Sequence, residues 1–299
     1  MAANNVNLRT AQWVKNDEFF TQLADIENEL RFYRTHFRDK IIYCNCDDPA
    51  RSQFWRYFKL HFSEFKLKEL LATCHVPSGP AHAAAWGTGG IRTWPLKSGD
   101  FRSLECTAIL QRADIIVTNP PFSLWREYAA QLAAYRKKFI IVGPMNAITY
   151  KNIFPLLQDN KIWLGNTQIK TFLTLDSGIR QFGNVFWYTN LDHSMRHEPL
   201  TLTRVYDPAL FPTYENYDAI EVSRVTNIPR DYDGVMGVPI SFLTRYCPDQ
   251  FEILGLSSMV ATRFPSGLPK HQKGGMRFYL KDPDGTYRRL YERLAIKKK

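Results

Sequence analysis

The chain has 299 residues, 44% of them hydrophobic and 23% charged, which leaves room for one large or two ordinary domains with a sizeable core. No apolar run approaches the roughly eighteen residues that a membrane-spanning helix needs, and the first residues lack the apolar stretch of a signal peptide. These features favour a soluble, cytoplasmic protein over a membrane-spanning or secreted one.

The charge is strongly positive, with 39 Lys and Arg against 29 Asp and Glu, a net charge of +10. A positive field attracts polyanions and therefore favours a nucleic-acid partner. A solvated basic surface explains the same excess, and Lys297-Lys298-Lys299 could belong to such a surface. Charge alone leaves both interpretations open.

The five cysteines indicate reduced thiols, because their number is odd and no CxxC pair occurs. A zinc cluster of Cys44, Cys46, Cys74 and His75 can be imagined. Alternate residues of a strand point the same way, however, and do not close a tetrahedron around a metal. We therefore expect no metal.

The first elements predicted are a helix, a strand and a second helix. Apolar residues with helical spacing predict an amphipathic helix over residues 17–37. A short apolar strand over 40–44 is followed by a polar turn, and Pro49 suits the first position of a helix over 49–62. Residues 67–74 fit a strand or a helix.

The middle of the chain alternates between helices and strands. Residues 76–99 hold five glycines and three prolines and predict a long loop. A helix over 104–112, a strand over 114–118, a helix over 123–136 and a strand over 138–142 follow. This alternation predicts an α/β fold, with a mostly parallel sheet covered by helices on both faces.

The pattern changes in the last part of the chain. Residues 171–175 and 184–189 are strand-forming and predict an antiparallel pair across a turn at 176–178. From about residue 199, prolines, tyrosines and short strand-like runs dominate. We therefore expect one domain over residues 1–200 and a smaller mixed region over residues 201–299.

Asn119-Pro120-Pro121-Phe122 directly follows the apolar strand 114–118, where a doubly wound sheet binds its ligands. An aromatic amine is a poor nucleophile because its lone pair is delocalised into the ring. If the Asn119 oxygen and the Pro120 carbonyl accept its two hydrogens, the lone pair can be aimed at an electrophilic methyl group. Phe122 can stack on the aromatic ring that carries this amine, a contact worth roughly 1–3 kcal/mol if the ring is a nucleobase.

Other interpretations of this tetrapeptide exist. Asn and Pro are both turn formers, so the segment could be a plain turn. The same loop chemistry also suits adenine in RNA or the amide of a protein glutamine, since all these targets are planar amines. The loop therefore predicts the class of acceptor and not the polymer that carries it.

The chain resembles the EcoRI-type adenine-specific DNA methyltransferases over most of its length. The resemblance is carried by segments such as IIYCNCDDPARSQFWRYF, GDFRS, ADIIVTNPPFSLWREY and FGNVFWYTNLDH. It implies a Rossmann-like S-adenosylmethionine-dependent methyltransferase domain over 1–200, duplex DNA as the partner, and a DNA-recognition region over 201–299. The enzyme would act on a flipped adenine and has no need to be a dimer.

The resemblance also suggests cofactor-binding residues, and we expect Asn119 to be one of them. Thr21 matches a segment that approaches the methionine carboxylate, or it could simply pack in a helix. Asp100 and Phe101 match an acidic-aromatic pair that holds the cofactor adenine, and Asp100 could instead cap a helix. The usual glycine-rich turn is absent. Its place is taken by a turn in which we expect Asn45, Cys46 and Asp47 to line the site.

Basic residues are expected to contact the DNA backbone. The candidates are Arg92, Arg263, Lys270, Lys273 and Arg277, the last four in the segment RFPSGLPKHQKGGMR. Trp86 and Trp94 could wedge into the gap left by a flipped base, or pin their loop to the core. Because the cofactor turn lacks glycine, a catalytically inactive DNA-binding relative also stays open.

Overall fold

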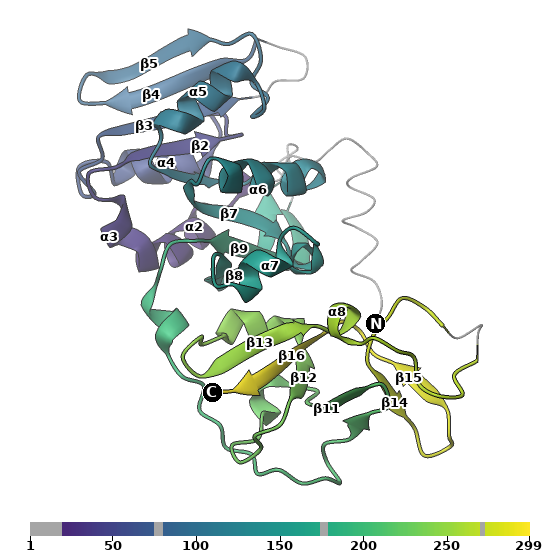
Figure 1. Cartoon of the computed structure of the whole chain (residues 1–299). Coiled ribbons are helices and arrows are strands. Elements are labelled where there is room, and N and C mark those ends of the chain that lie inside the picture. Colours follow the sequence, from purple (N-terminus) through teal and green to yellow (C-terminus); the bar gives the residue numbers. More distant parts are fainter. Residues whose placement is uncertain (1–19, 75–79, 174–178, 270–272) are drawn as a thin grey trace. The chain divides into compact units, whose positions relative to one another are not determined.

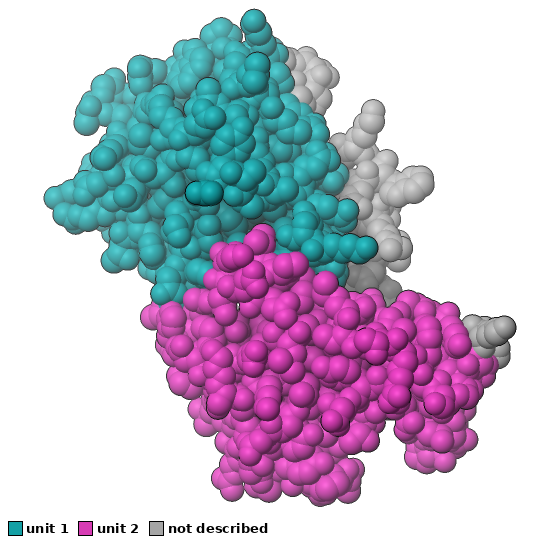
Figure 2. All heavy atoms as spheres, in the orientation of Figure 1, with its two compact units in different colours: residues 1–153, 162–193 teal, residues 154–161, 194–299 magenta. Residues whose placement is uncertain are grey.

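The computed structural model describes residues 20–74, 80–173, 179–269 and 273–299. The chain divides into two compact units, coloured separately in Figure 2: residues 1–153 with 162–193, and residues 154–161 with 194–299. It therefore passes from the first unit to the second, returns, and leaves again. Within the described ranges, no helix is long and apolar enough to cross a membrane.

A nine-stranded mixed sheet forms the centre of the first unit (Figure 1). Its order is β1 (Phe20–Thr21), β8 (Trp163–Leu173), β9 (Ile179–Thr189), β7 (Lys138–Pro144), β6 (Ile115–Thr118), β2 (Ile41–Asn45), β3 (Glu69–Cys74), β4 (His82–Gly87) and β5 (Gly90–Pro95). The middle strands β7, β6, β2 and β3 run parallel, and those on both sides pair antiparallel. The α/β fold is confirmed, but the expectation of a mostly parallel sheet was wrong, because a hairpin extends each edge.

The hairpin of β4 and β5 corrects the expected long loop over residues 76–99. Gly87 and Gly90 are register partners at its turn, and Gly90 has a φ of +87°, a conformation that suits glycine. These glycines therefore close a tight turn between two strands. β4 pairs with β3, and local composition does not reveal such a pairing. On the other side of the sheet β8 and β9 are antiparallel as predicted, but residues 185–189 pair with residues 163–169 and not with 171–175. The turn at 176–178 lies outside the described residues.

Helices cover both faces of the sheet. In Figure 1, α5 (Leu104–Arg112) and α6 (Trp125–Ala134) lie in front of the strands and α4 (Gln53–Leu60) lies behind. α2 (Leu23–Leu30) packs against α4. Phe54 of α4 meets Trp187 of β9 edge-on, with the ring centroids 5.9 Å apart, so aromatic packing fixes this helix on the sheet.

The helix expected over residues 17–37 is divided into several pieces. Residues 17–19 lie outside the described ranges, and β1 precedes α2, the 3-10 helix η1 (Arg31–Tyr33) and α3 (Arg34–Phe37). The buried side chains Ile26, Leu30 and Phe37 keep helical spacing. The periodicity therefore identified the apolar face but not the breaks.

α4 begins later than expected. Pro49 lies in a turn, and the helix starts at Gln53 behind Ser52, whose Oγ accepts a hydrogen bond from the Trp55 amide at 3.2 Å. A serine side chain satisfies an amide that the first turn leaves unpaired, which makes it a strong helix start.

Among its described residues, the second unit contains a five-stranded sheet, a hairpin and two short α-helices. The sheet has the order β10 (Thr213–Tyr214), β11 (Tyr217–Glu221), β12 (Met236–Pro239), β16 (Arg293–Lys298) and β13 (Phe251–Leu256). The hairpin joins β14 (Tyr279–Lys281) to β15 (Tyr287–Arg289), and the helices are α7 (Phe154–Gln158) and α8 (Ser257–Val260). Further 3-10 helices are η3 (Met145–Thr149) in the first unit, and η4 (Ser194–His197), η5 (Val225–Asn227) and η6 (Ile240–Arg245) in the second.

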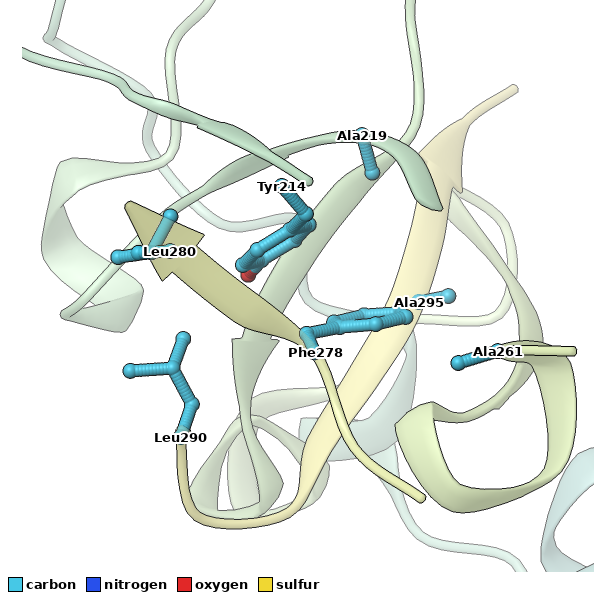
Figure 3. Close-up of a cluster of buried hydrophobic side chains, with 7 residues drawn as sticks. All are labelled: Tyr214, Ala219, Ala261, Phe278, Leu280, Leu290 and Ala295. Atoms are coloured by element: carbon cyan, nitrogen blue, oxygen red, sulfur yellow. The ribbon is translucent and has the colours of Figure 1, made fainter. Parts of the chain in front are cut away.

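An apolar cluster joins the sheet, the hairpin and α8 in this unit (Figure 3). It consists of Tyr214, Ala219, Ala261, Phe278, Leu280, Leu290 and Ala295. Phe278 is fully buried, and its ring stacks on Tyr214 at a centroid distance of 4.4 Å and on Tyr217 at 4.8 Å. The second unit therefore has a core of its own.

Candidate functional site

The carboxyl ends of β2, β3 and β6 meet at one edge of the parallel strands. Asn45 ends β2 and is the register partner of Thr73 in β3, whose Oγ1 donates to Asn45 Oδ1 at 3.0 Å. Thr118 ends β6, and its hydroxyl donates to the main-chain oxygen of Asn45. All three side chains are fully buried. This edge is where ligands bind in open α/β sheets.

The turn after β2 has an unusual backbone conformation. Cys46 has a φ of +72°, in the left-handed region that glycine adopts most easily. The Asp47 amide then donates to the Thr73 carbonyl at 3.1 Å, which returns the chain towards β3. The glycine-free sequence therefore still forms the left-handed turn, with a cysteine in the place where a glycine would be expected.

We expect Cys46→Gly to be as stable as the original protein, and Cys46→Val to be destabilised. A β-branched side chain in the left-handed region costs about 1–2 kcal/mol. Urea unfolding of the two variants measures the difference, with Cys46→Ala as the intermediate control. Equal stability of the valine and glycine variants would contradict strain at this turn.

Asp47 is the centre of a buried polar group. Its Oδ1 accepts from Ser52 Oγ at 2.7 Å, and its Oδ2 contacts the Thr118 hydroxyl. Burial raises the pKa of the Asp47 carboxyl to about 7, and hydrogen bonds from Thr118 and Ser52 oppose this shift. Asp47 therefore links the turn after β2 both to the start of α4 and to the strand that precedes Asn119.

Thr118 and Ser52 are polar partners that the sequence interpretation missed. Ser52 had a detectable signal, since a serine directly before an amphipathic run is a helix cap. Thr118 looked like an ordinary strand residue. Its importance depends on β6 lying beside β2, a pairing of strands that are far apart in the sequence.

Asn119, Pro120, Pro121 and Phe122 leave the end of β6 and lead into the 3-10 helix η2 (Phe122–Leu124). Asn119 is half-buried and Pro120 is buried. Phe122 is only 5% exposed, and its ring meets Phe172 of β8 edge-on at 6.4 Å. To stack on a base, Phe122 would have to leave this contact.

Asp100 and Phe101 precede α5. Asp100 accepts hydrogen bonds from the Arg102 amide at 2.8 Å and pairs with its guanidinium at 2.6 Å, whereas Ser103 caps the helix. Phe101 is 3% exposed and packs edge-on against Tyr128 at 5.0 Å. Burial raises the pKa of the Cys46 thiol, and the carboxylates of Asp47 and, more weakly, Asp100 raise it further.

Buried polar atoms of the first unit favour a polar ligand. The Oγ1 of Thr21, the Nδ2 of Asn45 and the Oη of Tyr128 are buried without a hydrogen-bond partner among the described residues. Such groups are rare in proteins, and a bound ligand would remove their desolvation penalty. Thr21 is the register partner of Phe172, which in turn contacts Phe122. These residues fit a small ligand rich in amines and oxygens.

The expected DNA-binding residues fall into two groups. In the first unit, Arg92 on β5 is exposed and pairs with Glu69 at 2.9 Å. Trp86 on β4 lies under the Lys59 ammonium, 4.2 Å from the ring centroid, which ties this tryptophan to α4. Arg92 and Trp86 therefore both have partners within the first unit, Glu69 and Lys59 respectively.

The other basic candidates lie in the second unit. Arg263 and Lys273 are exposed, and the Lys273 ammonium lies 5.3 Å from the Phe264 ring. Arg277 is less exposed and pairs with Glu292 at 3.1 Å. Lys270 lies outside the described residues. The structure thus places exposed positive charge on both sides of residues 270–272.

None of the five cysteines forms a disulfide within the described structure. In the part of the chain that the structure describes, no three acidic, cysteine or histidine side chains are grouped so that they could hold a metal ion.

Known proteins match the sequence over most of its length. The family described as "Adenine-specific methyltransferase EcoRI" matches residues 7–87 and 81–299. No solved structure matches the chain significantly.

Three similar proteins have names that agree with this match. The chain is 43% identical over 295 residues to the Type II methyltransferase M.EcoRI of Escherichia coli, with 85% of this chain and 90% of that protein covered. It is 34% identical over 267 residues to the Type II methyltransferase M.MgeORF184P of Mycoplasma genitalium, with 82% and 84% covered. It is also 34% identical over 266 residues to the Type II methyltransferase M.MpnI of Mycoplasma pneumoniae, with 82% and 83% covered.

Proposed function

We propose, from the premise that this chain belongs to the family of adenine-specific EcoRI methyltransferases, that it transfers a methyl group from S-adenosylmethionine to N6 of a flipped adenine in duplex DNA. Family membership makes the chain a site-specific DNA adenine methyltransferase, which requires a methyl donor. The observation that carries the proposed mechanism is the Asn119-Pro120 loop at the end of β6, tied through Thr118 to the turn after β2.

Asn119 and Pro120 would act on the amine that receives the methyl group. Proline has no amide hydrogen, so the loop offers acceptors and few donors. The Asn119 side-chain oxygen and the Pro120 carbonyl would accept the two hydrogens of the adenine amine and direct its lone pair. The Thr118 contacts hold the first residue of the loop against the turn after β2. Pro121 restricts the backbone further, and Phe122 would pack against the base.

The cofactor would lie at the edge formed by β2, β3 and β6. S-adenosylmethionine supplies a methyl group on a sulfonium, which a neutral amine can attack. The unpartnered Thr21 Oγ1 and Asn45 Nδ2 fit its carboxylate and hydroxyl oxygens. Asp47 suits its ammonium or ribose, with Cys46 lining the same turn. The cofactor adenine would be held by Asp100 and Phe101.

Asp47 leads to a pH prediction. A cationic ligand beside this carboxyl favours the anion and lowers its pKa from about 7, so binding releases a proton below that pH. Affinity for S-adenosylmethionine should therefore rise by up to about tenfold per pH unit as the pH increases towards 7, and then level off. Calorimetric titrations between about pH 5.5 and 8 measure this slope. Asp47→Asn should bind more weakly and abolish the slope; a slope retained in that variant would assign it to another group.

The substrate is tested by methyl incorporation from labelled S-adenosylmethionine into duplex DNA, RNA and protein. We expect incorporation into duplex DNA, at adenines of one recognition sequence when the product is mapped. Incorporation into RNA or protein alone would overturn the proposed substrate.

The basic residues Arg92, Arg263, Lys270, Lys273 and Arg277 would contact phosphates. Affinity for DNA should then fall steeply with salt, because each neutralised phosphate releases counterions. A salt-insensitive interaction would contradict this assignment.

A further inference from the structure

Asn216 lies in the turn between β10 and β11 and is 3% exposed. Its Nδ2 donates to the Arg263 carbonyl at 3.0 Å and to the Arg277 carbonyl at 2.8 Å. Its Oδ1 accepts from the Tyr279 amide at 3.0 Å. A single buried amide thus satisfies three main-chain groups from one stretch of the chain.

The two carbonyls that Asn216 binds are the ends of the segment 263–277, which we call the basic loop. This loop contains Arg263, Lys270, Lys273, Arg277 and His271, and it has no Asp or Glu. Because both of its ends bind the same Nδ2, they lie close together, as in compact surface loops with functional roles. Asn216 therefore holds the two ends of the basic loop together.

Two further contacts hold the described parts of the basic loop. The Tyr287 hydroxyl donates to the Ser266 carbonyl at 2.6 Å, and Arg289 Nε donates to the Gly275 carbonyl at 2.9 Å. Both donors belong to β15, whereas Asn216 precedes β11. The loop backbone is therefore anchored on either side of residues 270–272 by separate elements of the second unit.

We propose that Asn216 is a positioning residue for DNA binding: it closes the base of the basic loop, so that Arg263 and Lys273 meet the phosphates in a preformed arrangement. A loop fixed in its bound conformation loses less conformational entropy on binding. Asn216 itself donates both amide hydrogens to main-chain carbonyls and touches no DNA. The inference rests on the proposed role of the basic loop in binding DNA.

Asn216→Asp tests the proposal, since it keeps the shape and the acceptor for Tyr279 but removes both donors. We expect the KM for duplex DNA to rise roughly tenfold, with kcat and the affinity for S-adenosylmethionine unchanged. The salt dependence of DNA binding should become shallower by about one counterion per lost phosphate contact. A purely structural role would not change this slope.

Gln158→Glu is the matched control. Gln158 is another amide of the second unit whose Nε2 donates to two carbonyls, at 3.2 Å to Ile253 and at 2.9 Å to Leu254 of β13, and it does not touch the basic loop. The two substitutions make the same chemical change at different places. If both variants show the same DNA KM and salt slope, the proposal is overturned.

Tyr287→Phe decides the question if Asn216→Asp fails to fold. It removes one hydroxyl and releases Ser266 without adding a charge. We expect DNA binding to weaken about two- to fivefold with an unchanged melting temperature. Unchanged DNA affinity in this variant would overturn the proposal. Absence of DNA methylation by the original protein would instead overturn the proposed function, so the two failures are distinguishable.

Discussion

Asn119→Ala should lower kcat for DNA methylation by on the order of 10²–10³-fold while the affinity for S-adenosylmethionine largely persists. The alanine cannot accept a hydrogen from the adenine amine, so the nitrogen would lose one of the two proposed contacts that direct its lone pair. Thr118 and the turn after β2 are untouched, and their hydrogen bonds keep the carboxyl ends of β2 and β6 in place. Single-turnover methylation and calorimetric cofactor titration measure the two quantities separately.

Asn119→Asp is the informative control for this prediction, because it keeps an oxygen acceptor at the same place. It should retain more activity than the alanine variant. If the alanine and aspartate variants were equally active, or if alanine lost cofactor binding together with turnover, hydrogen-bond acceptance at Asn119 would not be its main contribution.

Glu29→Ala should destabilise the first unit by about 3–5 kcal/mol, because several buried donors would lose their acceptor at about 1–3 kcal/mol each. Glu29 is fully buried in α2. Its carboxylate accepts from the Tyr33 hydroxyl at 2.9 Å, the Asn166 amide at 2.9 Å, and the amide and hydroxyl of Thr167 at 2.7 Å. The register of the β8–β9 pairing shifts between Leu164 and Gln168. Glu29 therefore accepts hydrogen bonds from amides that lie at this irregularity of β8.

Denaturant unfolding measures this effect, with Glu27→Ala as the control on the exposed face of the same helix. That control should change stability by less than about 0.5 kcal/mol. Burial raises the pKa of Glu29, and its hydrogen bonds oppose the shift. Glu29→Gln should have an intermediate stability, because its NH2 group would face hydrogen-bond donors where a carboxylate oxygen now accepts from them. Equal stability of the Glu27 and Glu29 alanine variants would contradict the assigned role.

Local sequence patterns predicted elements that depend on local contacts. The helix over 104–112 coincides with α5, and the strand over 138–142 lies within β7. The 67–74 segment, which fits either a helix or a strand, forms β3 because β2 provides it with a parallel partner. The hairpin of β4 and β5 could not be predicted in the same way, since its glycines and prolines resemble a loop until β3 is known to pair with it.

The candidate site was likewise predictable only in part. The tetrapeptide at 119–122 was recognisable because its residues are contiguous and follow an apolar strand. The link from Thr118 to Asp47 was not, since it joins residues of two strands that are adjacent only in the folded sheet. Nor could composition show that Cys46 adopts a glycine-like backbone. A contiguous motif can thus be proposed from the sequence, whereas the contacts that support it require the topology.

Residues 154–161 belong to the second unit, although the chain on both sides of them belongs to the first. This short segment supplies α7 to the second unit, where Phe154 and Leu157 are buried. The chain then re-enters the first unit to form β8 and β9. A single cut near residue 200 would separate α7 from β13, to which Gln158 is hydrogen-bonded. Recombination that exchanges the second unit between relatives would therefore have to transfer two separate stretches of sequence together.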